Sequence, residues 1–108
     1  MLPKKNRVDK KNVDLIFKKG AFIVSPSFTF KFVLNNTHLK PRISFVVPKN
    51  IAKLAVKRNL LRRKGYFALK KHINQFPLGI IGVFIFKKVE ENISKIKDEI
   101  KNILNKIN

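Results

Sequence analysis

The chain has 108 residues, 44% of them hydrophobic, which is enough for one domain with a core of its own. It contains no cysteine, which excludes disulfides, thiolate metal sites and a cysteine nucleophile, and fits a cytoplasmic location. No apolar stretch approaches 18 residues, and the basic segment 1–7 lacks the apolar run of a secretory signal, so we expect neither a membrane span nor a signal peptide.

Charge is the strongest compositional feature. The chain carries 25 Lys and Arg against 6 Asp and Glu, a formal net charge of +19. All six acids lie near the two ends, so that residues 15–89 contain basic side chains and no acid. A surface that is merely rich in lysine explains many cations, but it does not explain the missing acids. Because self-repulsion of this size destabilises a compact domain, the charge predicts a nucleic-acid partner.

The first half of the chain predicts one helix and two strands. Residues 9–19 are expected to form a short helix that ends at Gly20. Residues 27–34 alternate as a strand, with Phe28, Phe30 and Phe32 on one face, and a short extra strand is possible at residues 22–24. Residues 35–37 form a turn, and residues 42–47 form a second strand that ends at Pro48.

The second half predicts a long helix, a buried strand and a last helix. Asn50 is expected to cap a helix over residues 51–74, and the apolar run 80–86 predicts a strand buried on both faces. The last helix begins near Glu90 and has one apolar stripe that starts at Val89. The order is α-β-β-α-β-α, which predicts an α+β fold: a single α-β sandwich domain over residues 1–108, with residues 1–8 as a flexible basic N-terminus.

The long helix carries most of the predicted chemistry. One face contains Leu54, Leu61, Gly65, Ala68 and Leu69, with the glycine allowing close approach to the sheet. On the other side a stripe of lysines has no acid at helical spacing to pair with, and Phe67 lies beside it. The stripe contains Lys53, Lys57, Lys64 and Lys71. Phosphate-binding residues are therefore expected on this helix and just before it: Lys49, Lys53, Lys57, Arg58, Arg62, Arg63 and Lys64.

Residues 56–63 resemble the helix that marks the bacterial ribonuclease P protein family, whose pattern is Arg-Asn-Arg followed by apolar-Lys-Arg. Arg58 and Asn59 match the first two positions, and Arg62 and Arg63 match the later basic pair. The strand 44–49 and the segment 16–20 also resemble the family, in the same order along the chain. The chain departs from the pattern at Leu60, where the family has Arg, and residues 7–17 are one residue shorter than the common spacing.

The resemblance implies a fold, a partner and a mechanism. The implied fold is ribosomal-protein-S5-domain-2-like, with a left-handed β-α-β crossover that general handedness rules do not predict. The resemblance implies that the chain is the accessory subunit of a ribonucleoprotein that removes the 5′ leader of precursor tRNA. In that family the catalytic RNA holds the Mg²⁺ ions that activate water, and the protein binds both that RNA and the single-stranded leader. No cofactor or metal is expected on the protein itself.

A candidate groove for the leader follows from the strand pattern. Opposite the Phe-rich face the two strands present a small, polar and basic surface, which the first helix is expected to border. An aromatic side chain beside a basic groove suits single-stranded nucleic acid. Phe17 has an alternative role in plain core packing. The predicted groove residues are Val13, Phe17, Thr29, Lys31, Arg42, Ser44 and Val46.

Other functions are less consistent with the sequence. The acids lie near the chain ends and do not cluster as a two-metal nuclease requires, so no catalytic residue is predicted. His38 and His72 are expected to be ordinary surface residues. A structural ribosomal protein is the main rival, and the motif at residues 49–63 argues against it. We see no helix-turn-helix for DNA, and membrane-surface binding is disfavoured because the apolar stripe of the basic helix is expected to face the core and has a Gly at its centre.

Overall fold

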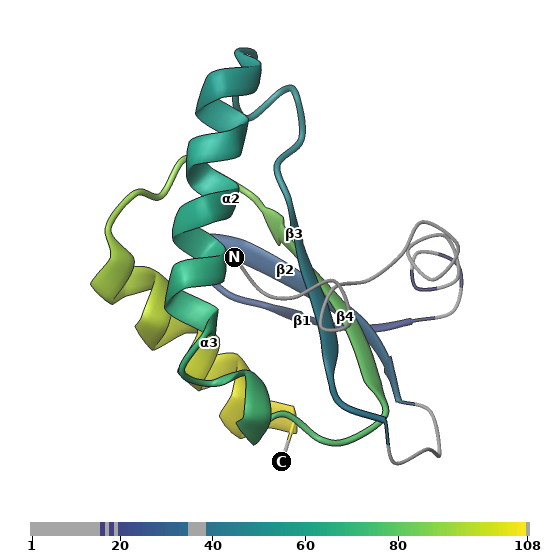
Figure 1. The fold of residues 1–108 in the computed structure, drawn as a ribbon. Helices are drawn as coiled ribbons and strands as arrows, with labels where there is room; N and C mark the ends of the chain where they lie inside the picture. Colours follow the sequence, from purple (N-terminus) through teal and green to yellow (C-terminus); the bar gives the residue numbers. More distant parts are fainter. Residues whose placement is uncertain (1–15, 17, 19, 35–38, 108) are drawn as a thin grey trace.

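The computed structural model describes residues 16, 18, 20–34 and 39–107. The described elements are the strands β1 (Ala21–Val24), β2 (Phe28–Leu34), β3 (Arg42–Val46) and β4 (Ile80–Phe86), and the helices α2 (Ala55–Leu69) and α3 (Ile93–Ile107), with a 3₁₀ turn over Ile73–Gln75. Both helices cover the same face of one sheet (Figure 1). The prediction of a two-layer α+β fold is therefore confirmed, and the extra strand is present.

The four strands form one sheet in the order β1-β2-β4-β3. The pairs β1–β2 and β2–β4 are antiparallel, whereas β3 and β4 are parallel and α2 connects them. The handedness of this β-α-β crossover remains a prediction. Strand alternation predicted the bounds well, since β4 spans the predicted residues, and β2 and β3 each differ by one residue at one end.

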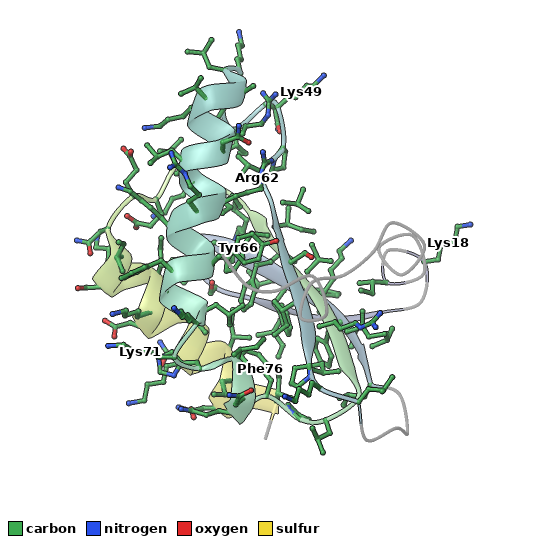
Figure 2. All side chains as sticks on the ribbon, viewed as in Figure 1. Lys18, Lys49, Arg62, Tyr66, Lys71 and Phe76 are labelled. Atoms are coloured by element: carbon green, nitrogen blue, oxygen red, sulfur yellow. The ribbon has the colours of Figure 1, made fainter. Side chains whose placement is uncertain are left out.

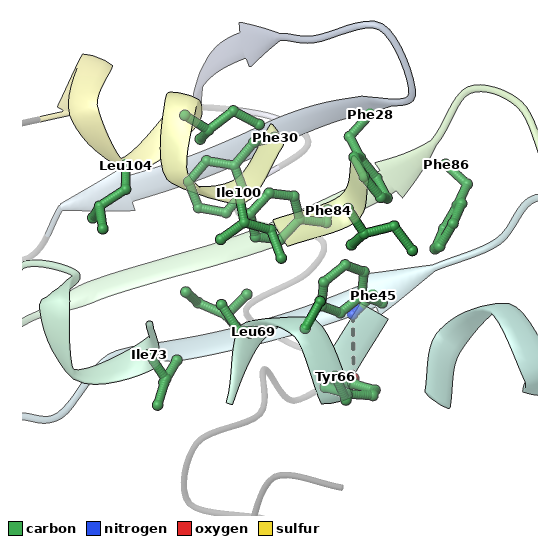
Figure 3. Packing of buried hydrophobic residues seen from close by; sticks show 14 of the residues in the cluster. Phe28, Phe30, Phe45, Tyr66, Leu69, Ile73, Phe84, Phe86, Ile100 and Leu104 are labelled. Atoms are coloured by element: carbon green, nitrogen blue, oxygen red, sulfur yellow. Dashed lines mark hydrogen bonds between the residues drawn. The ribbon is translucent and has the colours of Figure 1, made fainter. Parts of the chain in front are cut away.

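Aromatic rings fill the space between the sheet and the helices (Figure 3). Phe45 stacks on Phe84 at 4.9 Å between ring centroids, and Phe28 meets Phe86 edge to face at 4.7 Å. A Cβ built on Gly65 would lie 2.6 Å from Cδ2 of Phe45, so only glycine allows α2 this close to β3. Phe30 is also buried, Phe32 is half-buried against it, and the alternation is wrong at Leu34, which is exposed at the sheet end.

The structure corrects the bounds of the long helix. It begins at Ala55 and ends at Leu69, not at residues 51 and 74, so Asn50 does not cap it and Leu54 is exposed. Residues 48–52 form a turn instead, in which the N–H of Ile51 donates to the carbonyl of Pro48 at 3.0 Å. The helix ends where the chain turns into the 3₁₀ segment, whose Ile73 returns to the core.

The last helix also starts later than predicted, at Ile93. Asn92 caps it, because its Oδ1 accepts the N–H of Lys95 at 3.2 Å. The predicted apolar stripe is buried at Ile96, Ile100, Ile103 and Leu104, whereas Val89 lies before the helix and is exposed.

Glu99 of α3 has a buried carboxylate. Its Oε1 accepts hydrogen bonds from Oγ of Ser25 and from the N–H of Ser27, both at 2.7 Å. The carboxylate therefore ties α3 to the turn between β1 and β2.

The predicted first helix lies largely outside the described residues. Ile16 and Lys18 are helical, and the N–H of Gly20 donates to the carbonyl of Ile16 at 2.8 Å, so the helix ends at the predicted glycine. The predicted groove residues Val13 and Phe17 lie outside the described residues, as do His38 and the N-terminal segment 1–8.

Candidate nucleic-acid interface

The residues predicted on α2 divide into two groups on opposite flanks of the helix. Asn59, Arg62 and Arg63 line an open pocket of about 430 Å³ together with Val56. The Nη2 group of Arg62 donates a hydrogen bond to Oδ1 of Asn59, so the two side chains already lie side by side. Arg63 is exposed, and these two guanidinium groups supply planar donors suited to phosphate oxygens.

Lys57 and Lys64 occupy the other flank, towards the loop that precedes α3. Lys57 Nζ lies 2.8 Å from Oε1 of Glu91, and Lys64 Nζ donates to the carbonyl of Glu91 at 3.1 Å. The hydrogen bond and the charge of Lys57 lower the pKa of the Glu91 carboxyl below its ordinary value of 4.5, and Lys64 adds a smaller effect. The lysine stripe does therefore have an acidic partner, contrary to the sequence prediction.

Two predicted phosphate-binding residues and one further lysine of the predicted stripe lie outside the helix. Lys49 and Lys53 are exposed in the segment before α2, and Lys71 follows its C-terminal end. Figure 2 shows Lys49 and Lys71 at opposite ends of the helix. The wheel that grouped Lys53 and Lys71 with the helical lysines is therefore wrong, because neither residue is helical.

Arg58 has a structural contact that the sequence did not predict. Its Nη1 donates to the carbonyls of Ala52 at 3.0 Å and Lys53 at 2.7 Å. The guanidinium thereby holds the approach to α2 in place of a side-chain cap. A residue identified from its charge thus orders the segment that carries Lys49 and Lys53.

Tyr66 was missed as a positioning residue. It is buried, and its Oη accepts the N–H of Phe45 at 3.2 Å, which is the dashed line in Figure 3. The ring also meets Phe45 edge to face at 5.1 Å. Because β3 is an edge strand, this bond satisfies one of its outward N–H groups and fixes α2 against it. Arg62 lies one turn earlier on α2, so Tyr66 positions the flank that carries Arg62 (Figure 2).

The predicted leader groove lies on the sheet face away from α2 and α3. Strand register places Thr29 and Lys31 of β2 on this face, with Arg42, Ser44 and Val46 of β3. The two sets are not adjacent, because β4 runs between β2 and β3.

An apolar row from β4 therefore occupies the middle of the groove face. Ile85 lies between Thr29 and Val46, and Val83 lies between Lys31 and Ser44. Val83 is fully buried, Ser44 is 9% exposed, and the other predicted groove residues of β2 and β3 are half-buried. The strand pattern of residues 27–34 and 42–47 predicted a small, polar and basic surface without this apolar row, although the run 80–86 predicted a strand that is apolar on both faces.

The described residues contain no group of three or more His, Asp or Glu that could hold a metal ion. Glu91 pairs with Lys57, and Glu90 accepts the N–H of Asn92 at 3.2 Å. His72 is half-buried rather than exposed, and its Nδ1 has no hydrogen-bond partner. Within residues 20–34 and 39–107, no helix is long and apolar enough to cross a membrane.

Comparison with known proteins identifies relatives of one kind. The family model described as Ribonuclease P matches residues 2–108. The chain is 28% identical over 109 residues to the ribonuclease P protein component of Pseudanabaena sp. (strain PCC 6903), covering 98% of this chain and 94% of that protein.

Two solved structures share the fold at low sequence identity. The RNase P protein of Thermotoga maritima superposes with a TM-score of 0.80 at 23% identity, covering 94% of this chain and 97% of the other. The RNase P protein of Staphylococcus aureus superposes with a TM-score of 0.77 at 20% identity, covering 94% of each chain.

Proposed function

This chain belongs to the ribonuclease P protein family, and we propose that it binds the catalytic RNA through α2 and the 5′ leader of precursor tRNA through the sheet face away from α2 and α3. RNA binding and a part in tRNA processing follow from the family. The observation that carries the finer proposal is the pocket on α2, where Arg62, Arg63 and Asn59 converge on the flank away from Glu91. A phosphate entering this pocket meets two guanidinium groups, and the described residues place no carboxylate in its lining.

The leader proposal depends on the row of β4 as well as on the basic side chains. Lys31 and Arg42 supply positive charge at the two sides of the face, and the half-buried Ile85 supplies apolar surface between the two strands, whereas Val83 is fully buried. Single-stranded nucleic acid is bound by such a combination of apolar contact with bases and basic contact with phosphates. Val13 and Phe17 remain proposed members of the groove, from the sequence alone.

We propose that the protein is an accessory subunit and that the chemistry belongs to the RNA. Two of its acids have structural partners: Glu91 pairs with Lys57, and Glu99 holds the β1–β2 turn. The Mg²⁺ ions that cleavage needs are proposed to be held by the RNA, where the protein lowers the requirement by supplying positive charge. This function is proposed to be cytoplasmic.

Reconstitution tests the proposal. The protein, a bacterial ribonuclease P RNA and precursor tRNA are combined at low Mg²⁺, and cleavage is compared with that by either component alone. The wild-type protein should stimulate the RNA and cut nothing without it. Cleavage of precursor tRNA by the protein alone would contradict the assignment of an accessory subunit.

Two variants separate the two binding surfaces. Arg62→Ala with Arg63→Ala should weaken binding to the catalytic RNA and lower the log–log salt slope by about 0.7–0.9 for each phosphate that the variant no longer neutralises. Lys31→Ala should weaken binding of precursor tRNA to the holoenzyme and leave that of mature tRNA nearly unchanged. The control, Lys101→Ala with Lys106→Ala, removes the same charge from exposed positions of α3. If the two double variants have equal effects, α2 attracts RNA only through the general charge of the protein, and the assignment of a specific RNA contact to Arg62 and Arg63 is wrong.

A further inference from the structure

The outer face of α2 carries large apolar side chains that the core does not use. Phe67 is 59% exposed and Val56 is 79% exposed, although the same helix buries five residues on its inner face. Within the described part of the chain, Phe22 of β1 is the other exposed phenylalanine. This exposed ring of Phe67 lies in the last turn of a helix that contains no acid, and folding leaves most of its surface free to contact a partner.

The surroundings of Phe67 are cationic and partly ordered. Lys97 of α3 places its Nζ over the ring, 5.7 Å from the centroid, which is within cation–π range. Lys64 lies one turn before Phe67 on α2, and its Nζ is held at the carbonyl of Glu91. Glu91 pairs with Lys57 and interacts more weakly with Lys64, so this single carboxylate leaves the set of Lys57, Lys64 and Lys97 with a net positive charge.

An exposed ring beside lysines fits an unpaired nucleotide better than it fits a second copy of this chain. An aromatic face beside ammonium groups provides stacking for a base and charge for the phosphate attached to it. A second copy of this chain brings its own formal charge of +19, which opposes contact at a basic surface. An unpaired nucleotide is therefore the favoured partner, and an anionic membrane surface becomes an outcome of the test.

The position of Phe67 in the fold also indicates which RNA would supply the unpaired nucleotide. Phe67 lies on the outer surface of the helix layer, whereas the leader is assigned to the opposite face of the sheet. The helix layer and the sheet separate the two surfaces. We propose that Phe67, flanked by Lys64 and Lys97, stacks on an unpaired base of the catalytic RNA; this rests on the proposed function and adds a contact outside the Arg62–Arg63 pocket.

A tryptophan reporter tests the stacking directly, because the chain has no Trp of its own. Phe67→Trp should bind ribonuclease P RNA at least as tightly as the wild type, with its emission quenched when the RNA is added. Phe22→Trp is the matched control, since Phe22 is equally exposed but lies on the sheet edge. With the catalytic RNA alone, its emission should stay nearly unchanged. Equal quenching at both positions, or quenching at neither, contradicts the proposal.

Phe67→Leu gives the second measurement. It keeps an apolar side chain on the helix and removes the flat ring, so RNA affinity should fall by about 5-fold or more while the salt slope stays that of the wild type. If Phe67→Leu binds normally and only the Arg62 and Arg63 variant loses affinity, the stacking proposal is wrong and the proposed function stands. If neither variant loses affinity, both are wrong. Binding of Phe67→Trp to phosphatidylserine vesicles with blue-shifted emission, and no quenching by RNA, assigns the ring to a lipid surface instead.

Discussion

The helices α2 and α3 have 15 residues each and cover the same face of the sheet, yet their outer surfaces differ in kind. In α3 the buried stripe is regular, acids are mixed with lysines, and no large apolar side chain is exposed. In α2 no acid is present, and Val56 and Phe67 point away from the core. Since both helices bury five residues, the difference lies in their outer surfaces: α3 mixes acids with lysines, whereas α2 presents cations and two large apolar side chains without an acid.

The largest expected effect is on the stability that α3 provides. Ile100 is fully buried among the aromatic rings of the core, so Ile100→Ala should lower the free energy of unfolding by about 2–5 kcal/mol. Val56→Ala on the outer face of α2 removes a similar apolar group and should change the free energy of unfolding by less than about 0.5 kcal/mol. Urea denaturation measures both. A similar loss for the two variants would mean that the outer face of α2 also contributes to folding.

A smaller effect is expected where α2 joins the sheet. Tyr66→Phe keeps the ring but leaves the buried N–H of Phe45 without its acceptor, which should cost about 1–3 kcal/mol of stability. Phe67→Leu, the next residue along and exposed, is the control and should be nearly neutral in the same denaturation experiment. No change on Tyr66→Phe would show that water replaces the hydroxyl, and Tyr66 would then have no role in holding α2 against β3.

Local pattern in the sequence was sufficient for the strands and the inner helix faces. Alternation identified Phe28, Phe30 and Phe45 as core residues, and the apolar run gave the bounds of β4. The close approach of α2 to the sheet at Gly65 could also be predicted, because few other roles justify glycine in the middle of a helix.

Features that depend on tertiary contacts could not be predicted in the same way. The start of α2 depends on Arg58 binding carbonyls five and six residues before it, and a helical wheel treats that side chain as free. The apolar row on the groove face depends on β4 being inserted between β2 and β3, which strand pattern does not specify. The pairing of Lys57 with Glu91 joins residues far apart in sequence, so charge counting along α2 gave the wrong conclusion about an unpaired stripe.

The smallest expected effect concerns the ion pair between Lys57 of α2 and Glu91, which lies in the loop before α3. The lowered pKa of Glu91 is caused first by the hydrogen bond and charge of Lys57 and last by Lys64. Lys57→Gln should therefore raise the pKa of Glu91 towards 4.5, and Lys64→Gln should raise it less. A carboxyl NMR titration measures both shifts.

The sign of the linked stability change follows from the direction of the shift. Because the pKa of Glu91 is lower in the folded chain than in the unfolded one, its contribution is present above the unfolded value and is lost as the pH falls through the folded value. The contribution should be small, since the pair is at the surface and salt screens it. Equal shifts in the two variants would indicate that the general field of the basic helix, rather than the Lys57 contact, lowers the pKa. In that case α2 would have no flank distinguished by an acid, and all its cations would be equally available to RNA.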